Sequence, residues 1–134
     1  MIDENKRENI REEINRANHL LDAADYLNAG GFYNDAVSRL YYYLFYHFRA
    51  LLLSEDLEPK THEGISRLIG IRFVKPGILD VKSSRVFSRL MKYREEADYN
   101  PAFSFSEDEY LELREEAVEV GDAVRGYLRE KGYL

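Results

Sequence analysis

Apolar residues recur every three or four positions along almost the whole chain, and no segment alternates apolar and polar residues as a strand does. This period matches the α-helix, so the pattern predicts an all-α fold. A length of 134 residues is enough for one domain with a core of its own. We therefore expect a single helical domain over residues 1–134.

Glycine, proline and capping residues divide the chain into segments. We expect helices over about Asp3–Ala29, Tyr33–Ser54, His62–Ile71 and Ser83–Asp98, and from Ser106 to about Lys131. Gly30 and Pro101 stop two of them, and Ser106 followed by Glu109 is a capping-box pattern. Four long amphipathic helices with short links, plus one short helix, predict an antiparallel up-and-down four-helix bundle.

The segment from Leu40 to Phe48 is apolar or aromatic all the way round a helix. Such a helix is buried on more than one side. In a bundle of this size, one face enters the core, and we expect another face to meet a second subunit. The alternative, a platform for stacking bases, would require exposed rings. We predict a homodimer whose interface includes Tyr41, Tyr42, Phe45 and Tyr46.

The charge is unevenly distributed along the chain. The formal net charge is -6, yet the stretch from Lys60 to Arg94 holds nine basic residues and only two acidic ones. A basic segment in an acidic protein indicates an anion-binding surface, to which Arg85, Arg89 and Arg94 would contribute. Alternatively, the same residues pair with the acidic helices of their own fold. Charge counts do not choose between these two interpretations.

Several kinds of site are disfavoured by the composition. The chain has no cysteine, which excludes disulfides and thiolate metal sites. Its three histidines, His19, His47 and His62, lie far apart without a metal-binding pattern, so we expect neither a metal nor another cofactor. There is no signal-peptide stretch and no apolar run of membrane-spanning length. We expect a cytoplasmic protein that does not enter a membrane.

The stretch from Tyr93 to Tyr99 closes the helix before Asn100-Pro101, and helix physics alone does not explain it. Arg94 and Asp98 share a helical face, but this is the weaker order for such a pair. An acid in the last turn also opposes the helix dipole. The candidate site is therefore Arg94, Asp98 and Tyr99, a cation beside groups that could move a proton. The structural alternative is an ordinary salt bridge.

Three segments occur in an order that resembles HEPN-domain proteins, in a subgroup of small prokaryotic members. They are GFYNDAVSRLYY at 31–42, PKTHEG at 59–64 followed by Phe73-Val74, and REEADY at 94–99. The resemblance implies a dimeric helical bundle. It also implies a partnership with a minimal nucleotidyltransferase in a toxin–antitoxin type of system, in which the HEPN protein binds a nucleotide or RNA.

Many proteins of this kind are metal-independent ribonucleases with an arginine followed a few residues later by a histidine, in a cleft between two subunits. Arg94 occupies the arginine position, Asp98 approximately the histidine position, and no histidine follows Arg94. In some relatives the partner modifies a nearby tyrosine, and Tyr99 lies close to that place with a different spacing.

Three hypotheses follow. The first is a binding subunit that presents a nucleotide or RNA phosphate to a nucleotidyltransferase. The second is a ribonuclease toxin with an altered centre, in which Arg94 supplies the cation, Asp98 a base and Tyr99 a proton donor. The third is an interaction scaffold in which Arg94 and Asp98 only tie a helix end. The missing histidine ranks the binding subunit above the ribonuclease.

Overall fold

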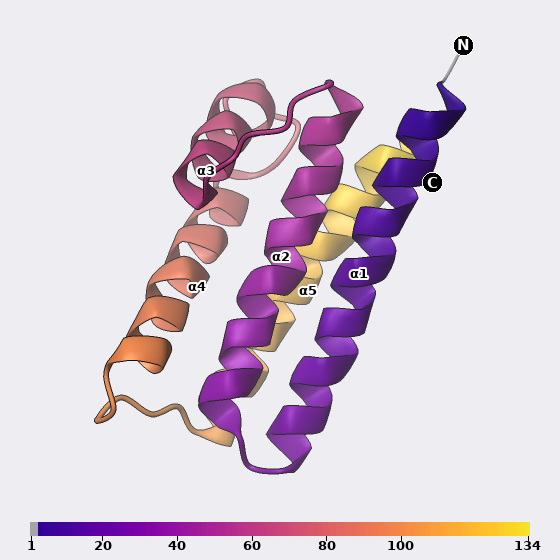
Figure 1. Cartoon of the computed structure of the whole chain (residues 1–134). Coiled ribbons are helices and arrows are strands. Elements are labelled where there is room, and N and C mark those ends of the chain that lie inside the picture. The colour runs from indigo at the N-terminus through magenta and orange to yellow at the C-terminus, as the bar shows by residue number, and fades with distance from the viewer. Residues whose placement is uncertain (1–2) are drawn as a thin grey trace.

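The chain forms an antiparallel helical bundle in a computed structural model that describes residues 3–134. Its elements are α1 (Glu4–Ala29), α2 (Tyr33–Ser54), α3 (His62–Ile69), a π-helical turn η1 (Gly70–Val74), α4 (Val81–Tyr99) and α5 (Glu107–Glu130). The long helices alternate in direction, so α1 begins and α5 ends at the same end of the bundle (Figure 1). The all-α up-and-down fold is thus confirmed for the described residues. The single domain over 1–134 and the dimer stay predictions, and residues 1–2 lie outside the described range.

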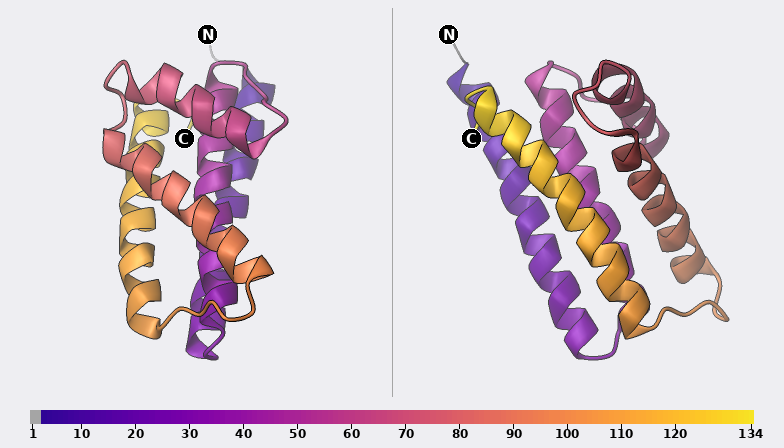
Figure 2. Two further views of the ribbon diagram at one scale, coloured as in Figure 1. Left: turned by 90° about the vertical axis from the view of Figure 1, so that its left-hand side faces the viewer. Right: turned by 180° about the vertical axis from the view of Figure 1, so that it is seen from behind.

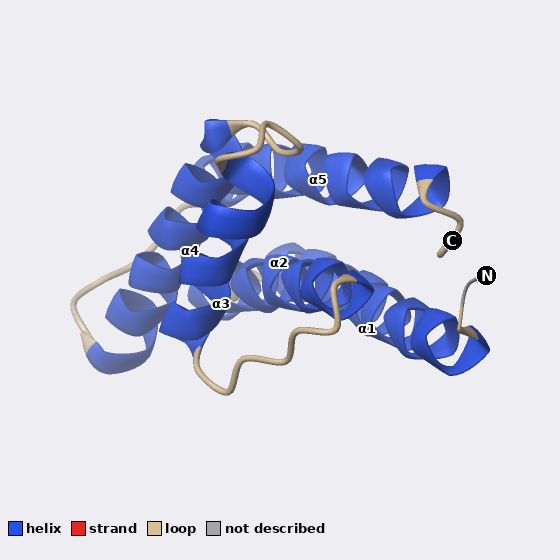
Figure 3. Cartoon of the chain, turned by 90° about the horizontal axis from the view of Figure 1, so that it is seen from above, coloured by secondary structure: helices blue, strands red, loops and turns tan. Residues whose placement is uncertain are grey.

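Helix α2 is the centre of the bundle. It contacts α1, α3, α4 and α5, whereas α4 and α5 touch each other only slightly. Figure 2 shows α4 crossing α2 obliquely, and Figure 3 shows α1 beside α2 with α5 opposite. Tyr41, Tyr43, Leu44 and Phe48 have no exposed surface. The neighbouring helices of one chain therefore account for most of the burial that the aromatic segment demands.

Capping residues set the ends of the helices. Asp80 Oδ1 accepts a hydrogen bond from the Lys82 amide at 2.8 Å, so α4 begins at Val81, two residues before the expected Ser83. The capping box of Ser106 and Glu109 is present at the start of α5, as the sequence predicted. Helix α4 ends at Tyr99, directly before Asn100-Pro101, in agreement with the expected stop.

Helix α3 ends at Ile69, before the expected Ile71, but the chain remains helical beyond it. It passes into the π-helical turn η1, where the Lys75 amide donates to the Gly70 carbonyl at 2.9 Å. The chain then turns at Gly77, whose φ of 86° favours glycine. Phe73 is fully buried and its carbonyl accepts from the Leu79 amide, which directs the chain back into α4.

Asn34 anchors the loop that follows α4. Its side-chain amide donates to the Phe103 carbonyl at 2.8 Å, and its Oδ1 accepts from the Phe105 amide at 2.9 Å. The ring of Phe105 lies 5.3 Å from that of Tyr93, one residue before Arg94. The loop is therefore fixed to the start of α2 by two hydrogen bonds and to the last turns of α4 by an aromatic contact. Within residues 3–134, no helix combines the length and apolarity needed to cross a membrane.

Candidate functional site

Arg94 projects from α4 onto the aromatic side of α2. Its guanidinium carbon lies 5.4 Å from the ring centre of Tyr41 and 5.7 Å from that of Tyr42. Both distances are within the range of a cation–π contact. Only 17 % of the Arg94 side chain is exposed. The positive charge is therefore held in place and partly shielded from water.

The hydrogen-bonding capacity of Arg94 is only partly used. Nη1 donates to Asp98 Oδ2 at 3.2 Å, as the four-residue spacing predicted. Nε is buried and has no acceptor among the described residues. A guanidinium offers five N–H donors, so Arg94 can still donate to a planar oxyanion. Asp98 is more open, with 38 % of its side chain exposed.

The ring of Tyr41 lies beneath this arginine and carries a hydroxyl with a raised pKa. Desolvation by burial is the main cause of the higher pKa, and the Arg94 charge opposes it. The hydroxyl is hydrogen-bonded to Nδ1 of His62 at the start of α3. A phenol can both donate and accept, so this hydrogen bond leaves Nε2 of His62 without a partner within the described chain.

His62 shares both of the rings that Arg94 contacts. Its imidazole centre lies 5.6 Å from the ring centre of Tyr41 and 6.3 Å from that of Tyr42, and Phe45 lies 4.8 Å away. Helices α3 and α4 thus bring a histidine and an arginine to the same pair of tyrosines. From the sequence, His62 was identified only as one of three isolated histidines, without a role in the candidate site. The signal that could have found it was the PKTHEG segment at 59–64.

Tyr99 is separate from this group. Its side chain is 79 % exposed, and it makes no hydrogen bond to Arg94 or Asp98 within the described chain. The structure therefore brings Arg94 and Asp98 together but leaves Tyr99 in solvent at the end of α4. A proton donor at that place would have to move to reach Arg94.

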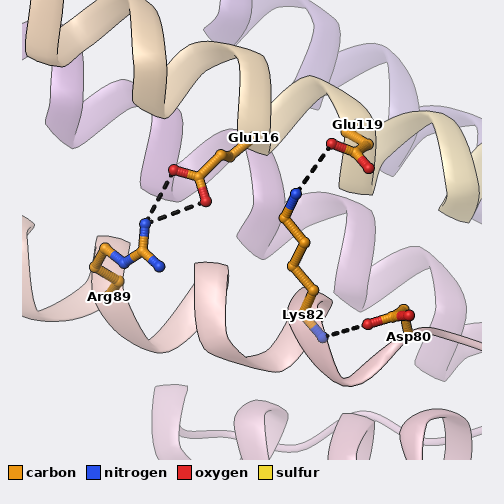
Figure 4. A network of polar contacts seen from close by, with 5 residues as sticks. All are labelled: Asp80, Lys82, Arg89, Glu116 and Glu119. Atoms are coloured by element: carbon orange, nitrogen blue, oxygen red, sulfur yellow. Dashed lines mark hydrogen bonds and ion pairs between the residues drawn. The ribbon is translucent and has the colours of Figure 1, made fainter.

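Arg85 and Arg89 lie elsewhere on α4. Figure 4 shows Arg89 Nη1 donating to both carboxylate oxygens of Glu116, at 3.0 and 3.1 Å, and Lys82 reaching Glu119 at 3.3 Å. Arg85 is exposed and precedes Arg94 by about two and a half helical turns, which puts it on the opposite side of the helix. The structure does not bring these two arginines to Arg94. Part of the basic segment pairs with α5, as the structural interpretation of the charge pattern predicted.

The four predicted interface residues differ in exposure. Tyr41 is fully buried, so it has no surface for a second subunit in this conformation, whereas Tyr42, Phe45 and Tyr46 are partly exposed. The guanidinium of Arg16 lies 5.0 Å from the Tyr46 ring centre. Arg49 lies 6.0 Å from the ring centres of both Phe45 and Tyr46. This partly exposed face therefore combines aromatic rings with cations.

A second polar cluster, between α2 and α5, is buried. His47 has no exposed surface; its Nδ1 donates to the Tyr43 carbonyl at 2.8 Å, and its Nε2 accepts from Arg125 at 2.8 Å. Burial lowers the pKa of His47 to about 4, and the Arg125 charge acts in the same direction. A neutral, fully bonded histidine holds two helices together rather than serving a ligand. No group of three metal-ligating side chains occurs within residues 3–134.

Comparison with known proteins identifies the family. Residues 10–127 match the HEPN domain. The chain belongs to the HEPN family. Two relatives from Methanocaldococcus jannaschii carry the names "Putative toxin MJ0142" and "Putative toxin MJ0605". The first is 34% identical over 96% of this chain and 77% of its own length, and the second 32% over 97% and 96%. A "UPF0332 protein" of Thermotoga maritima is 30% identical over 94% of this chain and 96% of its own.

The sequence of this HEPN chain departs from the arginine–histidine pattern described above. No histidine follows Arg94 on α4, and Asp98 stands near that position. His62 comes instead from α3 and is hydrogen-bonded to the hydroxyl of Tyr41, whose ring Arg94 contacts. Arg94 from α4 and His62 from α3 therefore both contact Tyr41 of α2, and Asp98 is paired with Arg94.

Proposed function

We propose that this HEPN protein binds the phosphate of a nucleotide or of RNA at Arg94, as the binding subunit of a toxin–antitoxin type of pair in the cytoplasm. Its partner in this proposal is a minimal nucleotidyltransferase. The resemblance to HEPN proteins that work with such enzymes supports the partnership. The names of the two archaeal relatives support the toxin context.

The proposal rests on one observation: Arg94 has N–H donors that have no acceptor within the described chain. The guanidinium rests on the rings of Tyr41 and Tyr42, and its buried Nε has no acceptor within the described chain. Nη2 likewise makes no hydrogen bond within the described chain and, unlike Nε, is not buried, so it can donate to a phosphate oxygen. Charge-assisted hydrogen bonds to phosphate are also stronger where water is partly excluded.

Metal-independent RNA cleavage is the second candidate, and His62 is the observation that favours it. Cleavage through the 2′-hydroxyl requires a group that accepts a proton beside a cation that binds the phosphate. His62 supplies an imidazole at the same tyrosine pair as Arg94. The absence of a histidine after Arg94 therefore counts less against cleavage than the sequence suggested.

The binding proposal is tested by calorimetry with ATP, GTP and a short single-stranded RNA at low salt. We expect Arg94→Ala to weaken binding roughly tenfold or more, the effect of losing a charge-assisted hydrogen bond. Arg85→Ala is the matched control, since Arg85 carries the same charge on the opposite side of α4. Wild-type protein that binds none of these ligands, or equal affinities for the two variants, would contradict the proposal.

We also propose that the protein dimerises through the partly exposed rings of Tyr42, Phe45 and Tyr46. Exposed aromatic surface is typical of interfaces, and these rings continue the buried face of α2. Light scattering at micromolar concentration should give the mass of a dimer. A monomer mass would contradict the proposed dimer but not the proposed phosphate binding at Arg94.

A further inference from the structure

We infer that His62 is a second phosphate-binding residue of the Arg94 site, and that it binds most tightly in its protonated form. The inference rests on the proposed binding of an RNA or nucleotide phosphate at Arg94. It adds a binding residue from another helix and makes the affinity for the phosphate depend on pH. The chemical class of ligand is a phosphodiester or phosphate monoester held between a guanidinium and an imidazolium.

The positions of the two cationic groups support a shared ligand. Arg94 and His62 each lie within 6.3 Å of the ring centres of both Tyr41 and Tyr42. Nη2 of Arg94 and Nε2 of His62 make no hydrogen bond within the described chain. Each residue thus has one nitrogen engaged inside the protein and another left for a ligand. A phosphate has enough oxygens to accept from both.

Tyr41 fixes the imidazole in either protonation state. The phenol can donate to a neutral Nδ1 or accept from a protonated one, because a hydroxyl does both. Protonation of His62 therefore loses no hydrogen bond to the protein. The same tyrosine has no exposed surface, so its own position is set by the core. Both ring nitrogens of His47 are bonded within the fold, whereas His62 keeps Nε2 for a ligand.

The charges around His62 come from three helices. Glu63 follows it on α3, and Glu95 lies on α4 close enough for both carboxylates to act on the Tyr41 hydroxyl. Arg94 lies on the same rings and is paired with Asp98. On α2, the Arg49 guanidinium lies 6.0 Å from the ring centre of Phe45, which contacts His62. A phosphate bound beside the imidazole adds a negative charge, and a negative charge favours the protonated form of a histidine.

The test uses a short single-stranded oligonucleotide with 2′-O-methyl riboses, which cannot be cut through a 2′-hydroxyl. Its affinity is measured by fluorescence anisotropy between about pH 5 and pH 8, where histidines change charge. We expect wild type to bind roughly tenfold more tightly at the acidic end of this range. There the slope of log affinity against log salt concentration should also be steeper, by about 0.7, than at the alkaline end. His62→Gln should retain binding that depends on Arg94 but lose most of this pH dependence.

His19→Gln is the matched control, because His19 is an exposed histidine on α1. It should keep the pH dependence of wild type. In parallel, NMR of the His62 ring in the wild-type protein should show its titration midpoint moving to higher pH when the oligonucleotide binds. A His62→Gln profile that matches wild type, or a midpoint that does not move, overturns the inference. Loss of binding in wild type itself, or binding indifferent to Arg94→Ala, overturns the proposed function instead.

Discussion

The guanidinium carbon of Arg94 lies 5.4 Å from the ring centre of Tyr41, and the hydroxyl of that same ring is bonded to His62. One buried tyrosine of α2 thus joins α3 to α4. His62 and Arg94 are far apart in the sequence, yet both contact this one side chain.

Tyr41 supports Arg94 with its ring and bonds His62 with its hydroxyl. Removing only the hydroxyl separates these two roles. Tyr41→Phe keeps the ring beneath Arg94 but leaves His62 Nδ1 without its partner. We expect a loss of about 1 kcal/mol in the free energy of unfolding, the usual contribution of one hydrogen bond. RNA affinity at about pH 8 should change little, since Arg94 keeps its support. Urea unfolding measures the first quantity and anisotropy the second.

Tyr42→Phe is the control for this variant, because the Tyr42 hydroxyl has no hydrogen bond within residues 3–134 and its side chain is partly exposed. It should be close to wild type in stability. If the two variants lose the same stability, the hydrogen bond between Tyr41 and His62 does not hold α3 in place.

Neutralising Asp98 should strengthen phosphate binding. Asp98→Asn removes a carboxylate that competes with phosphate for Arg94. Exposed ion pairs between residues four apart contribute only about 0.3–0.5 kcal/mol, so stability should change little. We expect a several-fold gain in RNA affinity in anisotropy. Glu119→Gln, which changes the net charge equally beside Lys82, should not give it. A loss of stability without any change in binding would instead favour the scaffold hypothesis.

His47 should make stability fall in mild acid. Its pKa in the folded state is lowered to about 4, so between its ordinary value of about 6.5 and about 4 the unfolded chain binds more protons. The contribution of the neutral His47 is present above about pH 6.5 and is lost as the pH falls toward about 4, by roughly 3 kcal/mol in all. Urea unfolding of wild type and His47→Gln across this range measures the difference. Parallel pH profiles for the two proteins would refute the assignment.

Two glycines of α5 make a matched pair for the packing of α2 on α5. A Cβ at Gly121 would collide with the hydroxyl of Tyr43, whereas a Cβ at Gly126 would meet nothing within 4 Å. We expect Gly121→Ala to destabilise the fold by about 1–3 kcal/mol through overpacking. Gly126→Ala should stabilise it by about 0.5–1 kcal/mol, because alanine favours a helix interior. Thermal unfolding compares them, and a stabilised Gly121→Ala would mean that α5 can move away from Tyr43.

The fold could be predicted from the sequence because apolar periodicity, capping residues, glycine and proline determine most of the helices. Tyr33–Ser54 was predicted with the bounds observed for α2. The apolar residues that repeat with helical period along α5 are buried: Tyr110, Leu113, Ala117, Val120, Val124 and Leu128. Misplaced boundaries arose where a cap or a π-helical turn decided them, at Asp80 and after Gly70. Such details depend on a few backbone hydrogen bonds that leave little trace in the apolar period.

The candidate site was predictable only in its local part. The contact between Arg94 and Asp98 follows from their spacing on one helix. The approach of His62 does not, because it depends on how α3 packs against α2, and no spacing rule reaches across two helices. The separation of Arg89 from Arg94 likewise depends on Glu116 of α5. Charge counts along a segment cannot show which side of a helix meets an acidic neighbour.

The most direct test of Arg94 as a phosphate-binding residue is the salt dependence of RNA binding. Affinities of wild type and Arg94→Ala for a short single-stranded RNA are measured between about 50 mM and about 200 mM salt. We predict that Arg94→Ala binds more weakly and that its logarithmic slope is shallower by about 0.7, the value for one lost phosphate contact on a single strand. Equal affinities and equal slopes for the two proteins would contradict the account.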